Sequence, residues 1–90
     1  MNSAIMKINT YPNPWDIEYF QEIANTLNLS RASERLGIGQ PALSLSLKRL
    51  EDNLGVKLFY RRNKGLSLTP AGLRLLKESN ALLSNWQSLV

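Results

Sequence analysis

Leucines and small polar residues alternate along residues 39–54 in a way that places them on opposite faces of one helix. Four leucines recur at i, i+4, i+7 and i+11, the spacing of a stripe buried against a core: Leu43, Leu47, Leu50 and Leu54. Gly39 is a permissible N-cap, Pro41 falls in the first turn, where its missing N–H removes no helical bond, and Gly55 follows as a stop. The pattern predicts a helix over 39–54.

A shorter helix and a turn are predicted immediately before it. Asn28 is a suitable N-cap, and Leu29, Ala32 and Leu36 follow at helical spacing. Residues 37–39, Gly-Ile-Gly, then form a three-residue turn. A short helix, a glycine-containing turn and a second helix together make a helix-turn-helix motif.

The polar face of the 39–54 helix carries Gln40, Ser44 and Lys48 four residues apart, beginning at the helix N-terminus. In a helix-turn-helix protein, that end of the second helix lies against base edges in the major groove. We therefore interpret 39–54 as a DNA recognition helix in which Gln40 and Ser44 read bases, Gln40 by pairing with N6 and N7 of adenine. The plainer interpretation of all three side chains is a solvated helix face.

A helix over residues 15–27 is predicted to cover the back of the motif. Its apolar residues fall at i, i+3, i+4 and i+7: Phe20, Ile23, Ala24 and Leu27. Asp16 and Glu18 lie in its first turn, where the helix dipole favours acids. Residues 1–14 lack a sustained period and end in two prolines that forbid helix, so we expect a flexible arm, in which Met6 is an alternative start.

Residues 56–69 change character and predict a β-hairpin. Two short segments, 57–60 and 66–69, flank the sequence Arg-Arg-Asn-Lys-Gly at 61–65. Three helices followed by a hairpin make a mainly α, winged helix-turn-helix domain over residues 15–69. Three cations at the predicted tip of the wing suit phosphates and the minor groove: Arg61, Arg62 and Lys64. The alternative is a turn kept charged for solubility.

Thr69 and Pro70 predict the start of a last helix that runs to residue 90. One thin domain cannot bury all the apolar residues of this helix, so we expect the 70–90 helix to pair with that of a second copy. The predicted dimer interface follows a seven-residue repeat and its intervening positions: Leu76, Ser79, Leu83, Trp86 and Val90. The alternative is a helix docked on its own domain.

Composition narrows the classes of function. The chain has 90 residues, 43% of them hydrophobic and 20% charged, which fits a single globular domain. It contains no Cys and no His, so the usual general bases, thiol nucleophiles and zinc ligands are missing. We therefore expect neither an enzyme nor a bound cofactor or metal. The longest wholly apolar runs are far shorter than the roughly 18 residues that cross a bilayer.

The charge is concentrated in the middle of the chain. Residues 31–77 hold ten of the eleven Lys and Arg but only three acids, a local net of +7, whereas residues 1–30 carry a net of −2. A basic block of this kind is the footprint expected for a polyanionic partner. The polar face of the recognition helix is too small and too neutral to favour a membrane surface.

Several linked motifs resemble one known family. They are LSRASERL at 29–36, QPALS at 40–44, LE at 50–51, LGVKLF at 54–59, Arg61, and LTPAG at 68–72. In this order and with this spacing, they are similar to the DNA-binding domain of LysR-type transcriptional regulators, over roughly residues 16–86.

The resemblance implies a bacterial, cytoplasmic regulator that binds an interrupted inverted repeat in double-stranded DNA as a dimer, commonly a dimer of dimers, and bends the DNA. It also implies that the 70–90 helix is an antiparallel dimerisation and linker helix, normally followed by a domain that senses a small-molecule effector. That second domain is missing from the sequence, and the end at residue 90 favours an excised fragment over a parent that has lost its sensor.

Carried over from the family, the base-reading positions fall on Gln40, Pro41, Ser44 and Leu45. The positions that contact the DNA backbone fall on Ser30, Arg31, Lys48 and, in the wing, Arg61. The chain departs from the family in two places. Gly39 replaces a capping Ser or Thr, and Leu45, which is suited to a thymine methyl, replaces a residue that is usually polar or basic.

A second function, of another class, is a winged-helix module for protein contacts that dimerises through its leucine-rich last helix. The two departures, Gly39 and Leu45, are what favours it. The two functions differ in their affinity for DNA and in its dependence on salt, which are small for a protein-interaction module.

Overall fold

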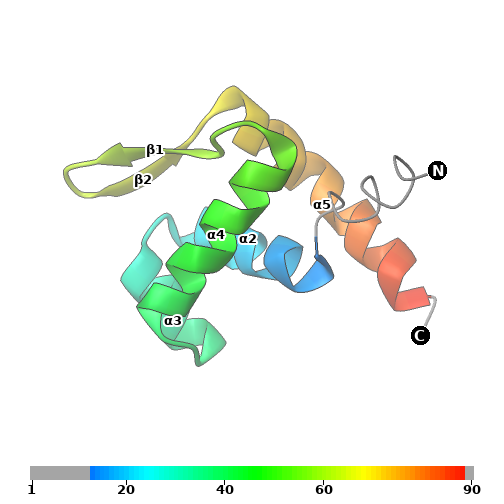
Figure 1. The fold of residues 1–90 in the computed structure, drawn as a ribbon, viewed down its shortest axis with the longest axis horizontal. Helices are drawn as coiled ribbons and strands as arrows, with labels where there is room; N and C mark the ends of the chain where they lie inside the picture. Colours follow the sequence, from blue (N-terminus) through cyan, green and yellow to red (C-terminus); the bar gives the residue numbers. More distant parts are fainter. Residues whose placement is uncertain (1–12, 89–90) are drawn as a thin grey trace.

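The computed structural model describes residues 13–88, without the side chains of residues 82 and 86–88. Along the described part of the chain, three helices are followed by a two-stranded hairpin and a long last helix (Figure 1). The elements are α2 (Pro14–Thr26), α3 (Leu29–Leu36), α4 (Gln40–Leu54), β1 (Phe59–Arg62), β2 (Gly65–Leu68) and α5 (Pro70–Ser88). This order confirms the mainly α, winged helix-turn-helix fold.

Helix α2 begins one residue earlier than predicted, at Pro14. Asn13 is its N-cap, and the Oδ1 atom of Asn13 accepts a hydrogen bond of 2.8 Å from the backbone N–H of Trp15. Proline is tolerated at the first helical position because its missing N–H has no helical partner there. Pro14 therefore belongs to the helix rather than to the predicted arm, and the rest of that arm, residues 1–12, lies outside the described residues.

The predicted boundaries of the helix-turn-helix are confirmed. Asn28 caps α3 through a 2.9 Å hydrogen bond from the backbone N–H of Arg31. Gly37 ends α3 at φ 71° and Gly55 ends α4 at φ 72°, in the left-handed region where glycine is favoured. Gly39 precedes α4 without a side-chain cap, so the N-terminus of α4 has no capping hydroxyl.

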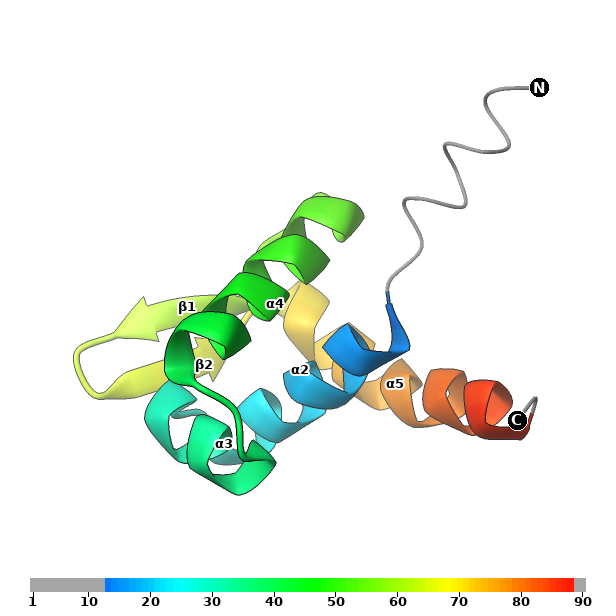
Figure 2. The same ribbon diagram turned by 60° about the horizontal axis from the view of Figure 1, so that its bottom comes forward.

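Helix α2 forms the centre of the molecule, and α3, α4 and α5 all pack against it (Figures 1 and 2). Three of the four leucines in the predicted stripe of α4 are buried: Leu43, Leu47 and Leu50. Leu54 was predicted to continue this stripe, but it is 38% exposed. The buried face of α4 thus ends one turn before the helix does.

The wing is a tight antiparallel hairpin in which Phe59 pairs with Leu68 and Arg62 with Gly65. Arg61 and Arg62 were predicted at its tip, but both lie in β1, so Lys64 is the one predicted cation that occupies the two-residue turn. The wing is anchored near its tip, because the backbone N–H of Leu66 donates a 3.0 Å hydrogen bond to the carbonyl oxygen of Leu27, the residue that follows α2.

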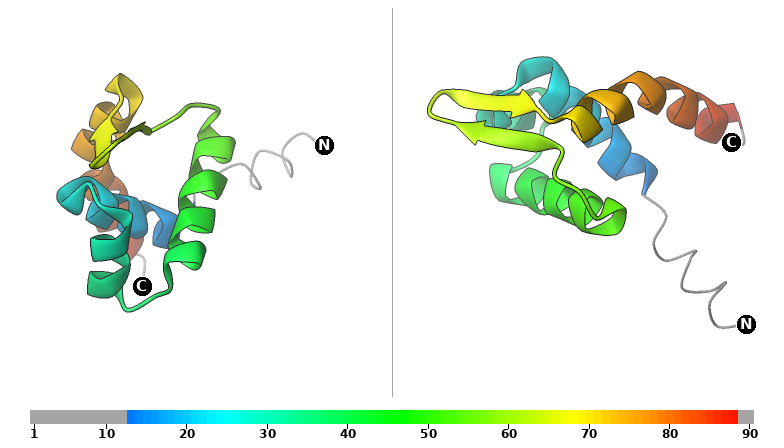
Figure 3. Two further views of the ribbon diagram at one scale, coloured as in Figure 1. Left: turned by 90° about the vertical axis from the view of Figure 1, so that its left-hand side faces the viewer. Right: turned by 90° about the horizontal axis from the view of Figure 1, so that it is seen from above.

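Thr69 caps α5 as predicted, accepting a 3.0 Å hydrogen bond from the backbone N–H of Gly72. Gly72 lies directly against the backbone before β1: a Cβ atom at this position would be 2.1 Å from the carbonyl oxygen of Leu58. The wing and the C-terminal end of α5 extend in opposite directions from the core (Figure 3, right).

The predicted dimer face of α5 requires a correction. Ser79 is fully buried and Leu83 is only 7% exposed, both covered by the chain itself, and Leu76 packs partly buried on the core. The Ser79 hydroxyl accepts a 2.8 Å hydrogen bond from Gln21 on α2. The seven-residue stripe therefore faces α2, because one helix of the same chain already covers it, while the side chain of Trp86 and all of Val90 lie outside the described residues.

Candidate nucleic-acid interface

The exposed face of α4 carries most of the residues that were predicted to read bases. Gln40, Pro41 and Leu45 are exposed, with Leu45 at 59%, and Ser44 is half-buried beside them. Lys48 continues this face one turn further and forms a 3.2 Å ion pair with Asp52. Exposed pairs of this kind contribute only about 0–1 kcal/mol, so Lys48 remains available to a phosphate.

The beginnings of α3 and α4 meet the wing at an open groove, which we call the junction groove. Its lining residues come from three separate parts of the sequence: Asn28, Leu29, Ser30, Gln40, Arg61, Arg62, Gly65 and Leu66. Across it, the hydroxyl of Ser30 donates a 2.8 Å hydrogen bond to Oε1 of Gln40. The structure thus brings together Ser30, which was predicted to contact the DNA backbone, and Gln40, which was predicted to read bases.

The wing presents its two arginines differently. Arg61 pairs with Leu66 across the hairpin, and residues that face each other on paired strands lie on the same side of a sheet. Arg61 lines the junction groove and a second groove shared with Leu47 and Glu51 of α4. Arg62 also lines the junction groove, but its side chain is engaged within the wing: it donates a 3.0 Å hydrogen bond to Ser67, and its guanidinium carbon lies 5.8 Å from the ring centroid of Tyr60.

The cations of the basic block fall into two groups. Five form ion pairs within the described chain: Arg35, Lys48, Arg49, Lys57 and Arg74. Among residues 13–88, no ion pair engages the other five, which are Arg31, Arg61, Arg62 and Lys64 on α3 and the wing, and Lys77 on α5. Most of the positive charge left unneutralised therefore belongs to α3 and the wing. These two elements meet α4 at one end of the molecule (Figure 2).

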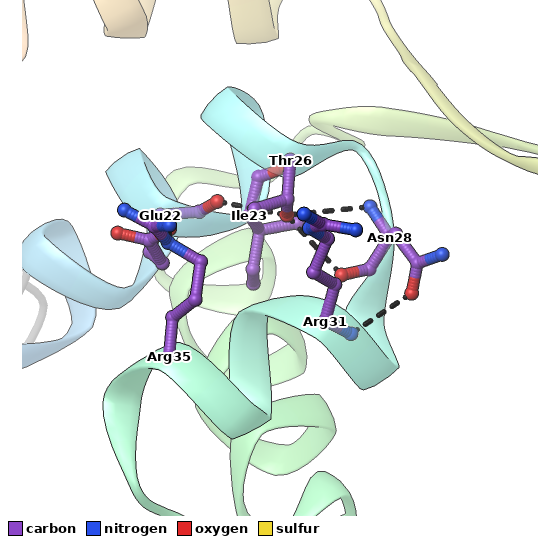
Figure 4. A network of polar contacts seen from close by, with 6 residues as sticks. All are labelled: Glu22, Ile23, Thr26, Asn28, Arg31 and Arg35. Atoms are coloured by element: carbon purple, nitrogen blue, oxygen red, sulfur yellow. Dashed lines mark hydrogen bonds and ion pairs between the residues drawn. The ribbon is translucent and has the colours of Figure 1, made fainter.

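A polar network fixes the start of α3 on the end of α2 (Figure 4). The hydroxyl of Thr26 donates a 3.0 Å hydrogen bond to the carbonyl oxygen of Glu22 and accepts one of 3.4 Å from the backbone N–H of Asn28, and Asn28 in turn caps α3. Arg35, in the last turn of α3, forms an ion pair with Glu22 of α2. Because of these bonds, the exposed Ser30 and Arg31 are held in place relative to the core.

A buried carboxylate fixes α4 in the same way, and the sequence analysis missed it. The side chain of Asp16 is fully buried, and its Oδ1 accepts hydrogen bonds from Ser46 at 2.6 Å and from Arg49 at 2.8 Å. Burial alone would raise the pKa of Asp16, but the hydrogen bonds from Arg49 and Ser46 and the charge of Arg49 lower it by more. The carboxylate is therefore ionised at neutral pH, with its pKa below the ordinary 3.8.

Glu51 holds the segment that leads from α4 into the wing. One of its carboxylate oxygens, Oε2, accepts a 2.8 Å hydrogen bond from the backbone N–H of Leu58, and the other lies 3.8 Å from Nζ of Lys57. In the sequence, the hint of these anchors is that Ser46 and Glu51 border the leucine stripe of α4. A polar side chain buried at such a position needs a hydrogen-bond partner, which Asp16 provides for Ser46 and the backbone of Leu58 for Glu51.

The described residues hold no cluster of three His, Cys, Asp or Glu side chains that would bind a metal ion. No described helix combines the length and apolar character needed to span a bilayer.

The sequence matches the family described as "Bacterial regulatory helix-turn-helix protein, lysR family" over residues 15–73. The transcriptional regulator XapR of Escherichia coli is 44% identical over 69 residues, which cover 77% of this chain and 24% of XapR. The chain spans about a quarter of the length of the curated relatives it matches.

Two solved complexes with DNA have the same fold. The CbnR DNA-binding domain bound to DNA matches with a TM-score of 0.80 and 30% identity, over 84% of this chain and 87% of that one. The BenM DNA-binding domain bound to catB site 1 DNA matches with a TM-score of 0.78 and 28% identity, over 86% of each chain.

Proposed function

The chain belongs to the lysR family of bacterial regulatory helix-turn-helix proteins and forms its DNA-binding domain, and on this premise we propose that it binds an interrupted inverted repeat as a homodimer. The observation that carries the proposal is the junction groove. Base-reading and phosphate-binding candidates from α3, α4 and β1 line it together, beside cations that have no acidic partner among the described residues.

In this proposal, the exposed face of α4 enters the major groove. Gln40 and Ser44 contact base edges there, Pro41 packs beside them, and the exposed Leu45 packs on a thymine methyl. The anchoring of α4 by Asp16 supports this assignment, because a rigidly held helix keeps its side chains in register with the bases.

In the same proposal, cations on α3, α4 and the wing contact the DNA backbone. Arg31 in the first turn of α3 and Lys48 on the exposed face of α4 are proposed to bind phosphates, and Arg61, Arg62 and Lys64 extend the basic surface along the wing. Contacts of this kind supply affinity without sequence preference and make it fall with salt.

The second copy is proposed to pair through the exposed face of α5. This face begins at Leu73, which is 46% exposed, and continues through Lys77, Ala81 and Ser84 at helical spacing. Sedimentation of the chain should give twice the monomer mass, and Leu73→Glu should give the monomer. A monomer for the unmodified chain at all concentrations would contradict the dimer.

The cellular setting follows from the family. We expect the protein to lie in the bacterial cytoplasm and to be associated with the nucleoid when it binds DNA. We expect two dimers to join in the full-length regulator. Any small-molecule effector would act through a part of the regulator other than the DNA-binding domain. A module for protein contacts is the weaker alternative, because α5 turns most of its leucine stripe to its own core.

Sequence preference is the direct test of base reading. A binding site selected from random duplexes should be bound more tightly than unselected DNA, and Gln40→Ala should lose that preference while still binding both. Arg74→Ala, which removes an exposed cation of α5 paired with Glu78, is the matched control and should leave the preference intact. Equal loss of affinity for both duplexes in Gln40→Ala would contradict the assignment.

A further inference from the structure

We propose that Ser30 is a positioning residue that fixes the Gln40 amide so that Gln40 reads guanine rather than adenine. The inference rests on the proposed function and names which base the α4 N-terminus selects. It comes from one contact, the 2.8 Å hydrogen bond from the Ser30 hydroxyl to Oε1 of Gln40.

This bond determines which end of the amide is free. A glutamine side chain has one acceptor oxygen and one NH₂ group with two donor hydrogens. Because Oε1 accepts from Ser30 on the α3 side, the NH₂ group is turned outward, and no hydrogen bond to a described residue engages it. Gln40 therefore presents donors to the major groove.

The four bases differ in how many hydrogen-bond acceptors they present to such a donor group in the major groove. Guanine offers two acceptors, O6 and N7, and so takes both donor hydrogens. Adenine and thymine each offer one acceptor, and cytosine offers only a donor. The adenine pair expected from the sequence needs Oε1 to face the DNA, and the bond from Ser30 holds this atom on the opposite side.

The same bond changes the role of Ser30. A serine hydroxyl has a single hydrogen, and this one is donated to Gln40, so it is not available to a phosphate oxygen at the same time. The phosphate role predicted for Ser30 is therefore replaced by an indirect one. Arg31, the next residue, has an exposed side chain and keeps its own phosphate role.

The test measures base preference at one base pair. That base pair is the one at which Gln40→Ala abolishes discrimination in a duplex selected from a random library. With all four base pairs placed there, the unmodified chain should bind guanine best, by about tenfold over adenine. Replacing guanine by 7-deazaguanine, which lacks N7, should remove most of this advantage.

Two changes at Ser30 separate positioning from a phosphate contact. Ser30→Ala frees the amide to rotate and should bring adenine to within about threefold of guanine. Ser30→Thr keeps the hydroxyl and should keep the guanine preference. Ser30 is exposed, so both variants should retain the melting temperature of the unmodified chain.

Three results would overturn the proposal: adenine bound best by the unmodified chain, a Ser30→Ala variant weakened equally on all four base pairs, or no base pair that responds to Gln40→Ala. In each of these cases preference for the selected duplex would still stand, and with it the proposed function. Equal binding of selected and random duplexes by the unmodified chain would instead remove the proposed function itself.

Discussion

Arg49 on α4 holds Asp16 on α2 through two hydrogen bonds, from Nη2 to Oδ1 at 2.8 Å and from Nε to Oδ2 at 2.9 Å. The carboxylate is fully buried, while the arginine side chain is half exposed. Together with the hydroxyl of Ser46, this pair fixes the recognition helix against the helix behind it. Arg49 therefore serves the fold, although its neighbour Lys48 is proposed to contact the DNA backbone.

Asp16→Asn should destabilise the domain by about 1–3 kcal/mol, because the variant places an amide opposite the Arg49 guanidinium and the Ser46 hydroxyl. Urea unfolding followed by circular dichroism measures the change. Asp52→Asn, which removes the exposed partner of Lys48, is the control and should alter the free energy of unfolding by less than about 0.5 kcal/mol. An equal effect of the two changes would contradict the anchoring role.

The stabilisation from Asp16 should depend on pH. Its pKa is lowered in the folded chain, so its contribution is complete above the ordinary value of 3.8 and disappears as the pH falls through the folded pKa. The difference in unfolding free energy between the unmodified chain and Asp16→Asn should therefore be largest near neutral pH and shrink on acidification below about pH 4. A difference that grows on acidification would show that the pKa is raised instead.

Gly39→Ser should stabilise the domain and strengthen DNA binding. Gly39 has φ −69°, and an added Cβ would meet nothing nearer than 3.7 Å, so serine fits and supplies the hydroxyl cap that α4 lacks. We expect a gain of about 0.5–1 kcal/mol and tighter binding to any duplex, measured by thermal melting and fluorescence anisotropy. Gly37→Ser is the contrasting change, and its φ of 71° should make it destabilising.

Gly72→Ala should disrupt the joint between the wing and α5. The added Cβ would overlap the carbonyl oxygen of Leu58 and press on a side-chain atom of Leu68 at 3.0 Å. A loss of about 2–4 kcal/mol is expected in urea unfolding, since backbone on both sides must shift. Ala71→Gly, at the neighbouring half-buried position, should cost only about 1 kcal/mol. Equal losses would mean that the close approach is relaxed in solution.

Local signals explain why the boundaries of the helices were predicted well from sequence. Asn28, Gly37 and Thr69 act within a few residues of themselves, and caps and stops of this kind are written directly into the sequence. The leucine period of α4 likewise identified its buried face up to Leu50.

The contacts that sequence reasoning missed join residues far apart in the chain. Asp16 and Arg49 are 33 residues apart, and no period or spacing announces such a pair. The stripe through Ser79 and Leu83 was predicted to face a second copy, because a heptad spacing does not say whether the helix that covers it is α2 or that of another chain. The hydrogen bond between Ser30 and Gln40 could not be predicted either, because it depends on how the turn between α3 and α4 places the two helices.

The central claim is that the wing and the exposed face of α4 bind the same duplex together. The salt dependence of DNA binding tests this claim most directly. Affinity for the selected duplex is measured between about 50 and 200 mM salt for the unmodified chain, Arg61→Ala and the control Arg74→Ala. We predict a steep loss of affinity with salt, a slope of log K against log salt that is smaller by about one in Arg61→Ala, and an unchanged slope in Arg74→Ala. A flat salt dependence in the unmodified chain, or equal slopes for all three proteins, would contradict it.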